Sequence, residues 1–138
     1  NTPEFNIQEG IKRIYTMQTY NGGFGYWPGS YDDNWWGTAY ATHFLIEAKK
    51  AGFEVEQNVI QNAVRYLKSK VKEKGQYSWS FYDVNNTLKS KTIAAREIFY
   101  SLYVLSLVNE QDLSVMNYYK TNTGMLSDDS KYMLAGTF

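Results

Sequence analysis

Apolar residues recur at helical spacing along most of the chain. The clearest stretch places them at positions i, i+3, i+4, i+7 and i+11, namely Ile60, Ala63, Val64, Leu67 and Val71. This spacing puts the side chains on one face of a helix with 3.6 residues per turn. By the same criterion we expect helices over residues 7–18, 36–51, 57–74, 92–108 and 112–120, and a last helix that begins at residue 127.

Glycine and aromatic residues gather in the segments between these helices. Gly23, Gly75 and Gly124 each follow a helical stretch, at intervals of 52 and 49 residues, and each interval holds two expected helices. A period near 50 residues with one helix pair per unit indicates an α/α repeat, which stacks into a solenoid or closes into a ring. The sequence therefore predicts an all-α fold, a partial α/α toroid of antiparallel helix pairs joined by Gly-aromatic loops.

One of these segments, residues 77–82, alternates between aromatic and hydroxyl residues over most of its length. Such alternation is typical of a strand, but six residues without a pairing partner make a poor sheet, so we expect a loop. We expect residues 1–138 to form a single helical domain. Six helices would make about half of a ring of twelve, which suggests a piece of a larger α/α toroid.

Charge and composition narrow the functional classes. Fourteen basic and fourteen acidic side chains cancel, so no net field draws nucleic acid or an anionic membrane surface. The chain is 43% apolar and can bury a core, but no apolar run approaches the roughly 18 residues of a spanning helix. We therefore expect no nucleic-acid partner and no membrane contact by this segment. The start at Asn1-Thr2-Pro3, without a signal segment, indicates a mature or excised fragment.

Few residues offer catalytic or metal-binding chemistry. The sequence has no cysteine, which excludes a disulfide, a thiolate metal site and a cysteine nucleophile within it. The single histidine, His43, has Glu47 four residues later but no obvious third ligand, so we expect a hydrogen-bonded structural role for it. We expect no metal, no cofactor and no catalytic residue.

The acidic pair Asp32-Asp33 leaves an alternative open. It lies in a loop flanked by aromatic residues, and paired carboxylates carry out acid–base chemistry in glycosidases. A carbohydrate-active enzyme of the α/α-ring type, or a cyclase, that uses these loop carboxylates is the alternative function, and a plain helical-repeat adaptor is a third. Asn85-Asn86-Thr87 is also a formal glycosylation sequon, which by itself decides nothing.

Two neighbouring segments carry the strongest signal. The first ends the first expected helix and continues through the glycine loop, with Gln18, Gly22, Gly23, Phe24, Gly25 and Trp27. The second opens the next helix, with Trp36, Thr38, Ala39 and Tyr40. In this order and spacing they resemble the thioester domain of bacterial alpha-2-macroglobulins, in the part downstream of the thioester loop. The resemblance covers about residues 7–135.

This resemblance implies both a fold and a function. The family is built on an α/α toroid and traps proteases: a bait region is cleaved, the protein changes shape, and a Cys-Gln thioester acylates the protease. The family's Cys-x-Glu-Gln motif is not in this chain, so we carry over no catalytic residue and expect a scaffold of the thioester domain. The implied partners are proteases and other domains of the parent macroglobulin. The implied location is the periplasm or the cell surface.

The spacing of Gln18 and Trp27 is also similar to the Gln-Trp repeat of terpene cyclases, which serves stability. A Gln amide can bond backbone groups at the next helix start while the Trp ring covers helix ends. The loop aromatics are therefore our candidates for a layer-tying or domain-contact surface: Phe24, Tyr26, Trp27, Trp35 and Trp36.

Overall fold

Helices account for most of the chain. The computed structural model describes residues 2–137 and, within that range, every side chain except those of Tyr77 and Trp79. Among the described helices, none is long and apolar enough to cross a membrane. In chain order the elements are α1 (Pro3–Thr16), α2 (Trp35–Lys50), α3 (Gln57–Lys72), β1 (Gln76–Tyr82), β2 (Leu88–Ala94), α4 (Arg96–Leu107), α5 (Leu113–Thr121), the 3-10 helix η1 (Thr123–Met125) and α6 (Asp128–Thr137).

Side-chain caps fix where α1, α2 and α5 begin. Thr2, Asn34 and Asp112 each accept the backbone N–H of the residue three positions later, at 3.1, 2.5 and 3.1 Å. These bonds satisfy amides that have no partner within the first helical turn. The cap at Asp112 confirms the start expected for the fifth helix.

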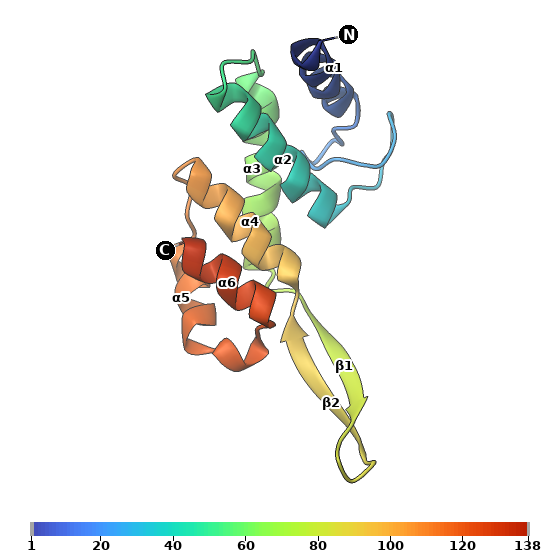
Figure 1. The fold of residues 1–138 in the computed structure, drawn as a ribbon, viewed down its shortest axis with the longest axis vertical. Helices are drawn as coiled ribbons and strands as arrows, with labels where there is room; N and C mark the ends of the chain where they lie inside the picture. Colours follow the sequence, from blue (N-terminus) through green and yellow to red (C-terminus); the bar gives the residue numbers. More distant parts are fainter. Residues whose placement is uncertain (1, 138) are drawn as a thin grey trace.

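The central helix of the assembly is α4. Helices α2 and α6 flank it, and α3 packs against both α2 and α4 (Figure 1). Because α4 has neighbours on several sides, most of its apolar side chains are fully buried: Ile98, Phe99, Leu102, Val104 and Leu105. The fourth helix is therefore apolar around most of its circumference.

A β-hairpin between α3 and α4 corrects the sequence prediction. Strand β1 pairs antiparallel with β2, with Ser80 opposite Ser90 and Tyr82 opposite Leu88. The prediction of a loop at residues 77–82 is therefore wrong, and so is the start of the fourth helix at Thr92, because residues 92–94 belong to β2. Figure 1 shows the hairpin extending away from the helical body.

The partner strand was missed for a physical reason. Most of β2 consists of polar residues, and only its last two residues, Ile93 and Ala94, are partly or fully buried. A strand without a buried face lacks the apolar alternation by which strands are recognised. The helical class stands, with this hairpin inserted between two of its helices.

Candidate functional site

The segment between α1 and α2 holds most of the residues singled out in the sequence. It folds back on itself: the N–H of Thr19 donates to the carbonyl of Gly23 at 2.7 Å, and the N–H of Gly25 donates to Met17 at 2.9 Å. The side-chain amide of Gln18 donates twice, to the carbonyl of Gly22 and to that of Val59, both at 3.1 Å. Gln18 thereby links the loop to the first turn of α3.

Two glycines let this loop lie directly on α3. Gly22 has φ +95° and is buried, and a Cβ built on it would lie 2.1 Å from the carbonyl oxygen of Asn62. A Cβ on Gly23 would lie 2.9 Å from the ring of Tyr66. A side chain at either position would push the loop away from the helix, so the backbone contact itself requires glycine.

Asp33 and Tyr66 form a polar tie beneath the same loop. The Tyr66 hydroxyl donates to Asp33 Oδ1 at 2.7 Å, and the Asn21 amide donates to Asp33 Oδ2 at 2.6 Å. Burial raises the pKa of Tyr66, and the hydrogen bond to the Asp33 carboxylate raises it further. The phenol therefore stays protonated as a donor over the physiological range. Sequence reasoning missed Tyr66, whose place among the apolar residues of α3 gives no sign of a polar partner.

The Phe24 backbone is tied to the start of α2. The N–H of Phe24 donates to Thr38 Oγ1 at 2.9 Å, and the Thr38 hydroxyl donates to the carbonyl of Asn34 at 2.6 Å. Phe24 is 4% exposed, and Thr38 and Ala39 are fully buried. Phe24 and Thr38 therefore form one contact between the loop and α2, whereas the Tyr40 side chain points outward and is 65% exposed.

The loop aromatics separate into inward and outward groups. Trp35 donates its indole N–H to Ser101 Oγ at 2.9 Å, which connects α2 with α4. The ring of Trp36 lies 4.8 Å from that of Tyr100 on α4, between ring centroids. Trp27, in contrast, is 60% exposed, so the expectation that its ring covers helix ends is wrong. Of the five candidate aromatics, Trp35 and Trp36 tie helices together, whereas for Trp27 the domain-contact alternative stays a prediction.

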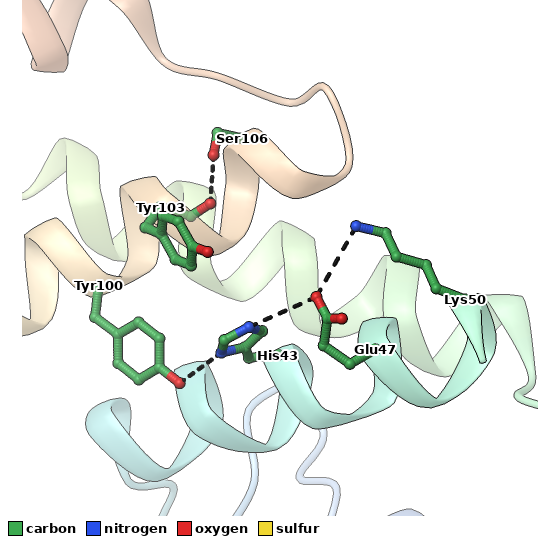
Figure 2. Close-up of polar contacts among 6 residues, drawn as sticks. All are labelled: His43, Glu47, Lys50, Tyr100, Tyr103 and Ser106. Atoms are coloured by element: carbon green, nitrogen blue, oxygen red, sulfur yellow. Dashed lines mark hydrogen bonds and ion pairs between the residues drawn. The ribbon is translucent and has the colours of Figure 1, made fainter. Parts of the chain in front are cut away.

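The imidazole ring of His43 projects from α2 toward α4, as Figure 2 shows. Its Nδ1 lies 3.0 Å from the hydroxyl of Tyr100, and its Nε2 lies 3.7 Å from Glu47 Oε1. The rings of Tyr100 and Tyr103 meet the imidazole edge-on, with centroids 5.8 and 5.7 Å away. The expected hydrogen bond of His43 is thus confirmed. Within residues 2–137, no group of three His, Asp or Glu side chains is arranged to hold a metal ion.

Asp33 is held in a hydrogen-bonded tie, and Asp32 is exposed to solvent. Both carboxylate oxygens of Asp33 are engaged by Asn21 and Tyr66, and Asp32 is exposed with its carbonyl accepting from Ser30 Oγ at 2.9 Å. The cavity beside this loop, between Ile14 of α1 and Ala41 of α2, has a volume of about 120 Å³. Ligand pockets usually measure roughly 300–1,000 Å³, so this one is too small for a sugar ring with its catalytic groups. The geometry favours a structural site.

Comparison with known proteins shows the family of the chain. The model of one protein family, the A-macroglobulin TED domain, matches residues 4–134. The chain belongs to this family. Its sequence is similar to that of alpha-2-macroglobulin from Xylella fastidiosa, with 31% identity over 110 residues, which make up 80% of this chain and 6% of that protein.

Solved structures of the TED domain family show the same fold. Native alpha-2-macroglobulin from Escherichia coli, from domain MG7 to the C-terminus, matches with a TM-score of 0.75 and 23% identity over 97% of this chain and 20% of that one. The trypsin-activated E. coli protein matches with a TM-score of 0.72 and 23% identity over 93% of this chain and 9% of that one. The predicted α/α toroid is therefore confirmed. The chain spans 6–8% of the length of the curated relatives it matches.

Proposed function

We propose that this chain is a scaffold of the thioester domain in a bacterial alpha-2-macroglobulin-like protease inhibitor. Family membership supports the proposal, and the observation that carries it is the Gln18–Val59 bond together with the glycine contact on α3. These contacts hold the family-motif loop directly against α3. A shielded thioester requires rigid surrounding structure that holds it in place.

The partners follow from the same proposal. The E. coli structure that matches this fold is described as trypsin-activated, so we infer that proteases and neighbouring domains of the parent protein are the partners of this chain. The chain has no cysteine, and any thioester would be supplied by other parts of the parent. We further infer that residues 1–138 form one helical unit of the ring and that the parent works in the periplasm or at the cell surface.

Trapping is tested on the parent protein that contains these residues. Increasing amounts are mixed with trypsin, and trypsin activity is then measured on a protein substrate and on a small chromogenic peptide. A trap shields the bound protease from large substrates only, so activity on the protein should fall while activity on the peptide is retained. Equal loss of both activities, or loss of neither, contradicts the proposed function.

The scaffold role is tested by two glycine variants of the parent. Gly22→Ala forces the loop away from α3, whereas Gly29 also has a positive φ but no atom within 4 Å of an added Cβ. Gly22→Ala should reduce the amount of trypsin retained per parent molecule, and Gly29→Ala should leave it near the wild-type amount. If the two variants retain trypsin equally, the loop is not part of the support.

A further inference from the structure

The apex of the β-hairpin carries a sequon that the proposed function does not use. Asn85-Asn86-Thr87 is the single Asn-x-Ser/Thr sequence in the chain. It lies in the turn between β1 and β2, at the far end of the hairpin from the helices (Figure 1). Val84 is fully exposed, and residues 85–87 are exposed as well. A modification here would touch neither the helical core nor the loop on α3.

The turn is organised by Asp83, two residues before Asn85. Asp83 Oδ1 accepts the backbone N–H groups of Asn85 and Thr87, both at 2.9 Å, and Asp83 Oδ2 pairs with Lys89 Nζ at 3.1 Å. Hydrogen bonds from the Thr87 backbone N–H and from the Lys89 side chain hold the pKa of Asp83 below its usual value, so the carboxylate is ionised. Asn86 completes the turn with φ 59°.

These backbone bonds leave the reactive side chains of the sequon unoccupied. Neither the side-chain amide of Asn85 nor the hydroxyl of Thr87 has a hydrogen-bond partner among the described residues. The amide nitrogen of such an Asn is the acceptor in N-glycosylation, and the hydroxyl two residues later belongs to the recognised sequence. Asp83, two residues before Asn85, holds the turn that displays both side chains.

We propose that Asn85 is the acceptor site for one N-linked glycan, transferred from a lipid-linked oligosaccharide. The Asn85 amide nitrogen forms a bond to C1 of the first sugar while the bond from C1 to the phosphate oxygen breaks. The lipid pyrophosphate leaves with the electron pair, and the amide gives one of its two protons to a base on the transferase. The inference rests on the proposed function only in requiring that the chain is exported.

The hairpin can present this sequence without unfolding the helices. A two-stranded hairpin is marginally stable by itself, and all of β2 up to Thr92 is exposed. Local opening of such an element costs far less free energy than global unfolding. The apex can therefore leave its turn, enter a transferase site in extended form, and close again around Asp83 afterwards.

The test uses the exported parent protein in a bacterial host that carries an oligosaccharyltransferase and its lipid-linked oligosaccharide. Trypsin cleaves after Lys74 and Lys89, so one peptide, residues 75–89, contains the whole sequon. Mass spectrometry should find this peptide heavier by the mass of one oligosaccharide. The unmodified peptide alone, from a parent protein that is recovered in the periplasm, overturns the inference and leaves the protease trap untouched.

Matched variants identify the acceptor. Asn85→Gln and Thr87→Val should abolish the added mass, whereas Asn86→Gln, one residue away, should keep it. Asp83→Asn loosens the turn, so the modified fraction of the peptide should stay the same or rise. An added mass that persists in Asn85→Gln, or one that is lost in Asn86→Gln, overturns the assignment of the site.

Discussion

The side chain of Gln18 is hydrogen-bonded to the backbone of Val59, 41 residues later in the chain, at 3.1 Å. This bond joins the end of α1 to the first turn of α3. The sequence predicted that this Gln would bond backbone groups at the next helix start, which is that of α2. The amide does bond backbone carbonyls, but it reaches past α2 to α3. Two other polar contacts act beside it: the N–H of Glu56 donates to the Tyr15 hydroxyl at 2.9 Å, and the Tyr66 hydroxyl donates to Asp33 at 2.7 Å.

Gln18→Ala removes both bonds of this amide, to Gly22 and to Val59. Because the carbonyl of Gly22 loses its partner in a partly buried place, the free energy of unfolding should fall by about 1–2 kcal/mol. Urea denaturation of the chain followed by tryptophan fluorescence measures the change. Gln8→Ala, an exposed position on α1, is the matched control and should have little effect. Similar losses in both variants would show that the long-range bond adds nothing.

Gly22→Ala should destabilise the chain far more than Gly29→Ala. Both glycines have a positive φ, which costs an alanine roughly 1–2 kcal/mol. Only at Gly22 would the added Cβ also meet backbone, 2.1 Å from Asn62 O, where neither element can yield easily. The difference between the two variants in urea denaturation isolates the contact with α3. Equal destabilisation would mean that this contact relaxes without cost.

Trp35 and Trp27 should respond in opposite ways to replacement by alanine. Trp35 packs against the core and bonds Ser101, so Trp35→Ala should lower the free energy of unfolding by about 3 kcal/mol. Trp27 is largely exposed, so Trp27→Ala should change it by less than about 0.5 kcal/mol. Thermal unfolding of the two variants checks this, and a large loss at Trp27 would restore the structural role first assigned to it.

The helices could be predicted from the sequence because each buries a stripe of apolar residues. In α3, Ile60, Ala63 and Leu67 lie at helical spacing and all are buried against neighbouring helices. The loop glycines could be recognised by type, and the approach of Gly22 to Asn62 explains why that type is needed. The sequence did not show which helix the loop packs against. The contact joins Gly22 to the backbone of Asn62, 40 positions later, and backbone atoms leave no signature in the sequence.

The hairpin and the Asp33–Tyr66 tie could not be predicted, for a common reason. Each depends on a partner residue that the local sequence does not identify. Lys89 and Lys91 of β2 are charged residues that occur equally in exposed loops and helices. Only their pairing with β1 shows that they belong to a strand. The direction of Trp27 was misjudged because an aromatic residue in a loop can face inward or outward with equal local preference.

Tyr119→Phe should make the chain more stable. Tyr119 is fully buried against Phe99, and its hydroxyl has no hydrogen-bond partner among the described residues. Removing an unpaired buried hydroxyl relieves its desolvation cost, so the free energy of unfolding should rise by about 1 kcal/mol. Tyr66→Phe is the matched control, because the Tyr66 hydroxyl donates to a carboxylate. In this variant the free energy of unfolding should fall by about 1.5–3 kcal/mol. A loss at both positions would indicate a partner for Tyr119 such as a buried water.

The same two tyrosines should make the chain sensitive to alkaline pH. Burial raises the pKa of Tyr119 to about 12, and burial and the bond to Asp33 raise that of Tyr66, from an ordinary value near 10. Above pH 10 the unfolded chain loses these phenol protons while the folded chain keeps them, so the unfolded state binds fewer protons and is favoured. The contribution of the protonated phenols to stability is fully present below pH 10, and for Tyr119 it is lost between pH 10 and about 12.

Urea midpoints measured across this pH range should fall less steeply in Tyr119→Phe than in the wild-type chain. Tyr20→Phe, at an exposed position, should not change the slope. A slope that is the same in all three chains would mean that the Tyr119 phenol ionises as readily in the folded state as in the unfolded one.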